Sequence, residues 1–258
     1  MSADPVYAGD EMAALYDLFF GGYAEDLHMY EQFARRGATA SLELGAGSGR
    51  IALHLARAGL DIVALDGSPA MLRRLDRVLD DTTRPRVRIV EGEMRRFDLG
   101  EQFDAIFCAA NTFQLLLTTE DQLAALRCIA AHLAPGGVFV AKVATVPSVD
   151  WGGGDGGMSL RQTAVDPATG ETVMRFDASR PRANELILER TIIYDRIRAD
   201  GSVLRRAADM ALRYAPPGEL ALLLDRAGLR PGQTYGDHDL SPFDEGSDTM
   251  VFVAEHPA

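Results

Sequence analysis

The stretch Ser41–Arg50, with the sequence SLELGAGSGR, decides how the rest of this chain is organised. Leu42 and Leu44 alternate with polar residues, which is typical of the end of a buried strand. The glycine-rich turn Gly45–Gly49 follows, and Ile51–Ala58 (IALHLARA) has the pattern of a helix. Glycine lets a ligand approach the main chain closely, and a helix start offers free N–H groups. The order strand, turn and helix therefore predicts a nucleotide-type ligand at this turn.

The glycine spacing separates two classes of nucleotide site. The dinucleotide fingerprint is G-x-G-x-x-G. Here Gly45, Gly47 and Gly49 give G-x-G-x-G, one residue shorter, and Glu43 stands two places before the first glycine. This pattern resembles motif I of the class I S-adenosylmethionine (SAM)-dependent methyltransferases. An NAD(P)-binding oxidoreductase, a non-catalytic SAM- or nucleoside-binding protein, and a turn without any nucleotide stay open as alternatives.

Composition narrows the class of protein. The chain has 258 residues, 47% of them hydrophobic, which is enough for one globular domain with an elaboration. A net charge of −12 disfavours nucleic acid and anionic membranes and favours cationic ligands. The N-terminal residues do not read as a secretory signal, and Cys108 and Cys128 are too few for a disulfide framework or a metal site. We therefore expect a cytoplasmic location, a small-molecule substrate, no metal, and no nucleic-acid or membrane partner.

Further strands and helices alternate along the chain. Apolar runs at 60–66, 87–91, 103–109 and 138–143 read as strands between helical segments, and 233–235 and 250–254 read as closing strands. With the strand at 41–44, they predict an α/β fold: a Rossmann-like, seven-stranded, mostly parallel sheet with helices on both faces. Thr119 and Gln122 have the spacing of a capping box at the start of one helix.

The first 38 residues form a separate aromatic-rich segment. Its aromatic residues are Tyr7, Tyr16, Phe19, Phe20, Tyr23, Tyr30 and Phe33. Gly21 and Gly22 divide it, so we expect two short helices, at about 10–20 and 23–36. The segment acts either as a core-packing cap or as a helical lid over the active site.

Residues 150–206 lose the helical period. A glycine-rich stretch at 151–157 is followed by runs of period two between turn signals. We expect an antiparallel β insert of three or four strands that shapes a substrate pocket or joins subunits in a homodimer or higher homo-oligomer. The predicted domains are a lid at 1–38, a SAM-binding domain at 39–149 and 207–258, and the insert at 150–206.

Asp66 ends the second predicted strand, 21 positions after Gly45. An acid at this distance hydrogen-bonds the ribose hydroxyls in Rossmann-type sites, and two carboxylate oxygens suit a vicinal diol. The alternative is an ordinary acid at a strand end.

From about residue 41 to 143 and again from 214 to 253, the order of elements is similar to that of class I methyltransferases. The Leu15-Tyr16-Asp17 segment and the β insert resemble the glycine N-methyltransferase-like and antibiotic-sugar N-methyltransferase branch. This resemblance implies SAM as cofactor and S-adenosylhomocysteine as product.

The resemblance also implies site residues. The implied cofactor-binding residues are Tyr16, Glu43, Gly45, Ala46, Gly47, Gly49, Asp66, Gly67, Ser68, Met71, Glu93, Met94 and Ala109. The implied substrate-binding residues are Tyr7, Phe20, Tyr23, Asn111 and Phe113, with Tyr16 and Phe113 beside the transferred methyl. Instead of binding a ligand, Met71 and Phe113 could pack in the core, and Asn111 could cap a loop. Glu93 is one methylene longer than the family's acid, which weakens its assignment.

The sequence shows no Ser/His/Asp or Cys/His arrangement at a recognisable spacing. Transfer of a sulfonium methyl is an in-line displacement, so positioning does much of the work, and a neutral amine needs no strong base. We therefore predict methylation of an amine in a bacterial natural-product pathway, with a small-molecule O-methyltransferase as the alternative.

Overall fold

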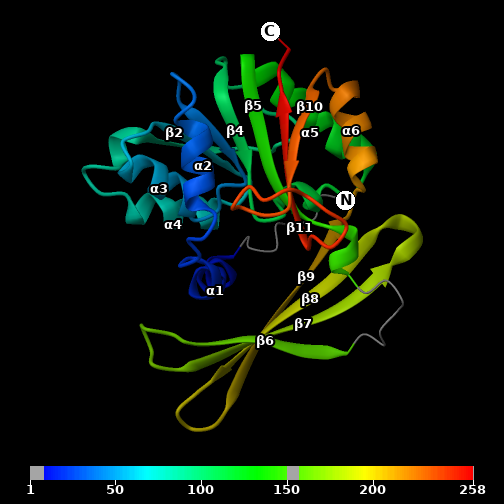
Figure 1. Ribbon diagram of the computed structural model, residues 1–258. Coiled ribbons are helices and arrows are strands. Elements are labelled where there is room, and N and C mark those ends of the chain that lie inside the picture. Colours follow the sequence, from blue (N-terminus) through cyan, green and yellow to red (C-terminus); the bar gives the residue numbers. More distant parts are fainter. Residues whose placement is uncertain (1–8, 150–156, 258) are drawn as a thin grey trace.

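The computed structural model describes residues 9–149 and 157–257, and within them a seven-stranded sheet has the order β10-β11-β5-β4-β1-β2-β3 (Figure 1). The strands are β1 (Ser41–Leu44), β2 (Ile62–Asp66), β3 (Val87–Glu91), β4 (Phe103–Cys108), β5 (Leu133–Ala144), β10 (Arg230–Tyr235) and β11 (Thr249–Glu255). β1 to β5 pair in parallel, and β11 runs antiparallel to both of its neighbours. The predicted α/β fold with a mostly parallel sheet is confirmed.

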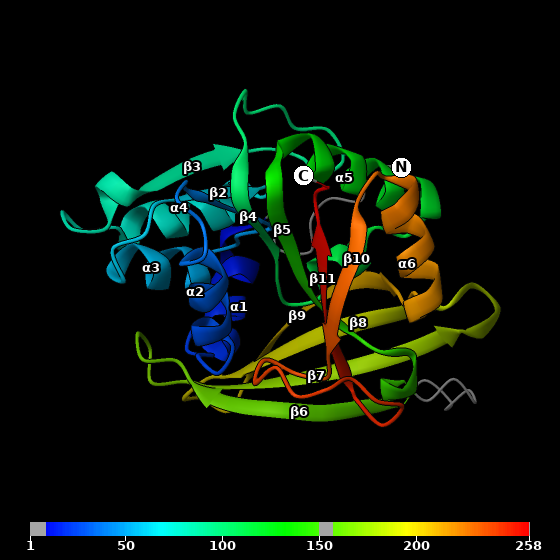
Figure 2. The same cartoon turned by 45° about the horizontal axis from the view of Figure 1, so that its top comes forward.

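Helices cover both faces of this sheet, because successive side chains of a strand point to opposite sides (Figure 2). The helices are α1 (Asp10–Phe20), α2 (Leu27–Ala34), α3 (Arg50–Arg57), α4 (Pro69–Val78), α5 (Thr119–His132) and α6 (Pro217–Arg226). Ile106 and Phe139 share a buried cluster with residues of α5 and α6, whereas Phe107 and Val140 share one with α2, α3 and α4. No helix in the described ranges is both long enough and apolar enough to span a membrane.

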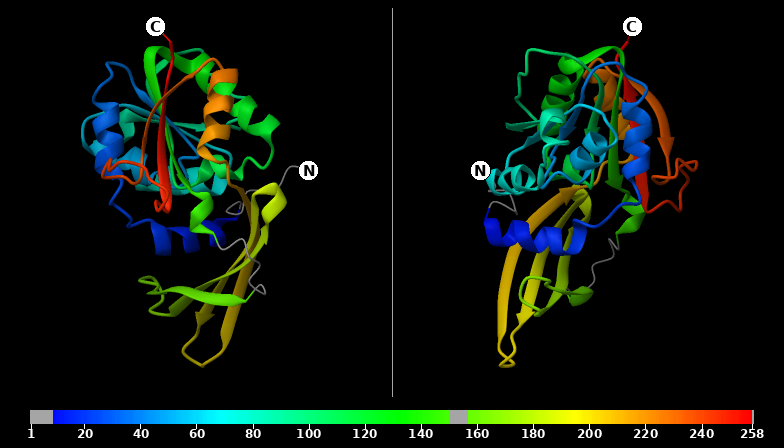
Figure 3. Two further views of the ribbon diagram at one scale, coloured as in Figure 1. Left: turned by 45° about the vertical axis from the view of Figure 1, so that its right-hand side comes forward. Right: turned by 90° about the vertical axis from the view of Figure 1, so that its left-hand side faces the viewer.

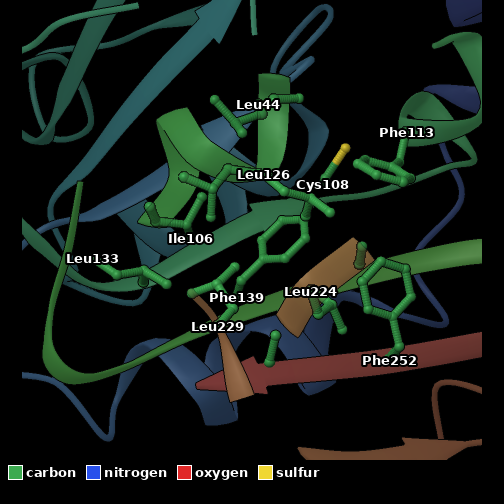
Figure 4. Packing of buried hydrophobic residues seen from close by; sticks show 14 of the residues in the cluster. Leu44, Ile106, Cys108, Phe113, Leu126, Leu133, Phe139, Leu224, Leu229 and Phe252 are labelled. Carbon is green, nitrogen blue, oxygen red and sulfur yellow. The ribbon is translucent and has the colours of Figure 1, made fainter. Parts of the chain in front are cut away.

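The core on the α5–α6 side is built around three phenylalanines (Figure 4). The Phe252 ring lies edge-on to the rings of Phe113 and Phe139, with centroid distances of 6.0 and 5.7 Å. Phe113 follows β4 in the short 3₁₀ turn Thr112–Leu115 and is 1% exposed. Burial of such a ring contributes about 1.5–3 kcal/mol, so Phe113 holds the loop after β4 against the core.

A second, four-stranded antiparallel sheet, order β6-β7-β8-β9, projects from the first (Figure 3). Its strands are β6 (Met158–Val165), β7 (Thr172–Arg182), β8 (Ile187–Ile197) and β9 (Val203–Arg213). The period-two pattern thus predicted the antiparallel pairing correctly. β9 continues past residue 206, so the division of the chain into lid, SAM-binding domain and insert stays a proposal.

Helix α1 lies between the two sheets in both views of Figure 3. Its Leu15 packs with Val173, Ile192 and Tyr194 of the second sheet, and the rings of Phe19 and Tyr194 are 5.6 Å apart. On its other side, α1 shares a small buried cluster with the start of α4. The helix therefore has apolar contacts on two sides and connects the two sheets.

Two local predictions are wrong. Helix α5 is capped by Thr118, whose hydroxyl accepts the Asp121 N–H at 3.1 Å, and Thr119 lies inside the helix. Gln122 is fully buried and donates to the Leu116 carbonyl at 3.1 Å, because tertiary packing rather than a capping box sets its position. Helix α2 begins at Leu27 rather than near residue 23, because residues 21–26 form turns.

Candidate functional site

The glycine turn between β1 and α3 is tight at its ends and open in the middle. Gly45 and Gly49 have φ angles of +72° and +88°, and a Cβ on them would lie 2.3 Å from Thr112 and 2.2 Å from Leu75. Gly47 has a φ angle of +57°, but a Cβ there would meet nothing within 4 Å. The turn therefore leaves space beside Gly47, where a ligand chain can lie against the backbone.

Asp66 ends β2 directly beside this space. One carboxylate oxygen accepts the Gly47 N–H and the other accepts the Ser68 N–H, both at 2.7 Å. Burial raises the pKa of Asp66, and these two hydrogen bonds oppose the shift. Each oxygen keeps a second lone pair, so the carboxylate can accept from two vicinal hydroxyls while it holds the turn.

Glu43 lies within β1, 3% exposed, below the same turn. Burial raises its pKa to about 8, against the opposing charge of Arg50. In the described ranges its Oε2 atom is buried with no hydrogen-bond partner. Such an acceptor fits the ammonium group of an amino-acid-like ligand, which a SAM molecule would supply.

Arg50 is a candidate site residue that the sequence pattern did not predict. It is the first residue of α3, immediately after the last glycine of the turn, and it forms an ion pair with Asp26, which is 1% exposed. Its Nη2 donates to Asp26 at 3.0 Å, and its Cζ atom lies 5.2 Å from the Tyr23 ring centroid. Its position directly after the glycine motif is the feature of the sequence from which a site residue could have been predicted. A guanidinium here can face the carboxylate of the ligand whose ammonium meets Glu43.

Helix α1 is tied to the glycine turn through Asp17. The Ser48 hydroxyl donates to Asp17 at 2.5 Å, and Arg74 of α4 forms an ion pair with the same carboxylate. Tyr16 packs against the buried cluster that contains Met71, and burial raises its pKa to about 12, with Glu43 and Asp66 among the charges that act on it. These contacts place the α1 segment over the turn, as a lid would lie.

The residues that were expected near the adenine form contacts with other parts of the protein. Met71 is 3% exposed and packs with Ala13 and Ala70, which favours the core alternative for its side chain. Glu93 forms an ion pair with Arg95 at 2.7 Å, which lowers the pKa of the Glu93 carboxyl. Met94 packs against the core on the α5–α6 side.

Ala46 and Ala109 are 6% and 5% exposed, and Gly67 follows Asp66 in sequence. All three lie at the carboxyl ends of neighbouring strands, β1, β4 and β2, as the predicted site requires.

The loop after β4 has an uncommon backbone. Ala110 and Asn111 have φ angles of +51° and +65°, a left-handed conformation that side chains other than glycine adopt rarely. The Asn111 N–H donates to the Lys142 carbonyl of β5 at 3.1 Å, which fixes the loop. Such strain persists where the surroundings impose it and clusters at functional sites.

The predicted substrate residues do not all gather at this loop. Phe20 lies 5.1 Å from Tyr16, ring centroid to centroid, and Tyr23, 36% exposed, stacks beside Arg50. Phe113 points into the core instead, so we leave it out of the proposed site. Tyr7 lies outside the described residues.

The strand order is that of the class I methyltransferase fold, and the glycine turn after β1 and the acid at the end of β2 lie where the resemblance predicts the cofactor site. Residues 42–137 match the family described as a methyltransferase domain. The chain is 27% identical to the CcbJ methyltransferase from Streptomyces caelestis, with a TM-score of 0.82 over 99% of this chain and 100% of that one. The protein is a SAM-dependent methyltransferase.

Two curated relatives cover most of the chain. One is the cypemycin N-terminal methyltransferase of a Streptomyces species, 28% identical over 83% of this chain and 82% of the relative. The other is the dTDP-3-amino-3,4,6-trideoxy-alpha-D-glucopyranose N,N-dimethyltransferase of Streptomyces venezuelae, 29% identical over 84% of this chain and 90% of the relative. The oxidoreductase alternative is thereby set aside.

Proposed function

We propose that this enzyme transfers the methyl group of SAM to an amine nitrogen of a small molecule in a bacterial natural-product pathway. The observation that carries the proposal is that, among the described residues, none of the five histidines forms a hydrogen bond with the glycine turn at 45–49 or with Asp66. Their partners are Gln32 for His28, Glu31 for His54, Leu99 and Cys128 for His132, Asp237 for His238, and Pro257 for His256. A neutral amine needs no strong base, whereas a hydroxyl does.

The relatives support the same reaction. The two that cover more than four fifths of the chain are named for N-terminal methylation of cypemycin and for N,N-dimethylation of an amino sugar. An aminosugar or an amino-acid-derived amine is therefore the acceptor class we propose. The chain's net charge of −12 favours the arrival of a cationic amine.

We propose that the cofactor is held by its two ends. Glu43 and Arg50 face the amino-acid end of SAM, and Asp66 faces the ribose hydroxyls. The backbone at Gly47 faces the part of SAM that connects these two ends. SAM supplies an electrophilic methyl group, and the protein's task is to hold an amine about 3 Å from it in line with the breaking bond. The rings of Tyr16 and Phe20 favour cations at their faces, which suits a sulfonium or ammonium group.

The acceptor class is tested with purified enzyme, SAM carrying a labelled methyl group, and matched acceptors that differ only in an amine or a hydroxyl. We expect release of S-adenosylhomocysteine and N-methyl products identified by mass spectrometry and NMR. The rate should rise with pH toward the acceptor's own pKa, because the amine must lose a proton before it attacks. Products methylated only at oxygen, sulfur or carbon would refute the amine proposal and leave the methyltransferase class intact.

A further inference from the structure

Three arginines meet at one carboxylate on the face of the second sheet that α1 covers. Asp177 of β7 is 5% exposed, and Arg175 Nη2 lies 2.9 Å from its Oδ1 atom. The Nε atoms of Arg161 and Arg190 lie 3.6 and 3.8 Å from its Oδ2 atom. Arg175 itself is 8% exposed.

The charges in this arginine cluster do not balance. Within the described parts of the chain, Asp177 is the only carboxylate that forms a salt bridge with Arg161, Arg175 or Arg190. The Nε atoms of Arg175 and Arg190 are buried and have no hydrogen-bond partner among those residues. A buried donor left without an acceptor destabilises the folded chain, and more so when it carries a charge. The cluster therefore combines three guanidinium groups with one carboxylate and keeps two buried Nε donors without an acceptor, although Arg175 also donates to Gln162 at 3.3 Å and Asp177 Oδ1 is likewise buried without a hydrogen bond.

The arginine cluster lies beside the lid. The Arg175 Cζ atom is 5.1 Å from the Phe20 ring, and the Phe20 ring is 5.1 Å from the Tyr16 ring. In the antiparallel register Arg175 is opposite Tyr194, whose ring contacts Phe19 of α1. Two contacts, from Arg175 to Phe20 and from Phe20 to Tyr16, thus connect the cluster to Tyr16, which packs against the start of α4.

We infer that Arg161, Arg175 and Arg190 form a subsite for an oxyanion, a phosphate or carboxylate group carried by the acceptor. This inference rests on the proposed function, in which the same acceptor presents its amine to the methyl group. Guanidinium groups bind such anions through paired, charge-assisted hydrogen bonds. The acceptor is then a molecule with an amine at one end and an oxyanion at the other.

The subsite is tested directly by titrating the full-length enzyme, saturated with S-adenosylhomocysteine, with inorganic phosphate and with acetate in a calorimeter. We expect wild type to bind at least one of them. The double variant Arg175→Gln/Arg190→Gln should weaken that binding by about tenfold or more. Arg180→Gln is the matched control, because Arg180 is exposed on the same strand and its side chain points to the opposite face.

The outcomes separate the two sources of the oxyanion. Binding of phosphate but not acetate assigns a phosphate-bearing acceptor, and the reverse assigns a carboxylate. The inference is overturned if wild type binds neither anion, or if Arg180→Gln weakens binding as much as the double variant. Cofactor affinity checks that each variant is folded. Arg190→Lys keeps the charge but loses the paired donors, so it should bind more weakly than wild type and more tightly than the double variant.

A methyl-transfer assay connects the subsite to the acceptor. For an acceptor with an oxyanion, the double variant should raise KM by about tenfold with little change in kcat, and a neutral acceptor should show no such rise. If only hydroxyl acceptors react, the amine proposal fails, whereas the anion titration still decides the subsite.

Discussion

Gly47 and Asp66 are the two residues on which the cofactor assignment depends most directly. Gly47→Ala and Gly47→Val place a side chain in the open space beside the turn, and Asp66→Ala removes two hydrogen-bonded oxygens. Hydrogen bonds to a charged group contribute about 1.5–3 kcal/mol each, so we expect SAM affinity to fall at least tenfold in every case. Calorimetry measures the affinity, and circular dichroism checks the fold.

Gly59→Ala provides the matched control for backbone strain. Gly59 also has a left-handed φ angle, +84°, with nothing within 4 Å of a Cβ, but it lies at the far end of α3. The control should lose some stability and keep its SAM affinity. If Gly47→Val and Asp66→Ala bound SAM as tightly as wild type does, the site assignment would be wrong.

Glu43 predicts a pH dependence of stability. Its pKa is about 8 in the folded chain and 4.5 ordinarily, so between these values the folded state keeps a proton that the unfolded state loses. The contribution of Glu43 is therefore fully present below about pH 4.5 and is lost as the pH rises through 8. The unfolding temperature of unliganded wild type should fall from pH 6 to pH 9 relative to Glu43→Gln. The exposed Glu245→Gln should follow wild type, and a parallel fall in Glu43→Gln would contradict the assignment.

Phe113 shows what a residue pattern leaves undecided. An aromatic residue in the loop after β4 fits a substrate wall or the core equally well, and only the positions of Phe139 and Phe252 place it in the core. We expect Phe113→Leu to lower the free energy of unfolding by about 1–2 kcal/mol and to leave the acceptor KM unchanged. Denaturant titration and steady-state kinetics measure the two effects; a raised KM with unchanged stability would restore the substrate-facing interpretation.

If helix α1 acts as a lid, as we propose, Tyr16 should affect turnover rather than stability. Its ring packs over the start of α4 and beside Phe20, so Tyr16→Phe keeps the packing and removes only the hydroxyl. We expect turnover to fall while the unfolding temperature changes little. Phe19→Ala is the structural comparison, because Phe19 contacts Tyr194 of the second sheet and not the cofactor turn. It should speed amide exchange across α1, and equal exchange in the two variants would argue against a mobile lid.

Local sequence signals predicted most elements correctly, because strand period and glycine turns are encoded within a few residues. The glycine turn, the end of β2 at Asp66 and the antiparallel insert all belong to this group. Pairs made by distant residues were missed: Asp26 and Arg50 are 24 positions apart, and Asp17 reaches Ser48 and Arg74 from another helix. No local pattern encodes such partners, since they depend on how the elements pack.

At the scale of the whole molecule, β6 is one of the two outer strands of the second sheet, and among the described residues it pairs only with β7. β6 is exposed almost throughout, with Met158, Leu160 and Val165 each about half exposed or more. We propose that copies of the chain associate through β6, because an open edge with apolar side chains is a template for strand pairing. Leu160→Lys should shift the sedimentation coefficient toward that of a monomer. Leu222→Lys, at an exposed leucine of α6, should not; a monomeric wild type would refute the proposal.

The position of α1 between the two sheets has a consequence for the order in which the chain is made. Leu15 and Phe19 emerge from the ribosome early, but their partners Val173, Ile192 and Tyr194 are synthesised more than 150 residues later. Until these partners are synthesised, the apolar side chains on one side of α1 stay exposed in the growing chain. A nascent chain that already contains the whole glycine turn therefore still lacks a closed cofactor site, and closure is among the last events of biosynthesis.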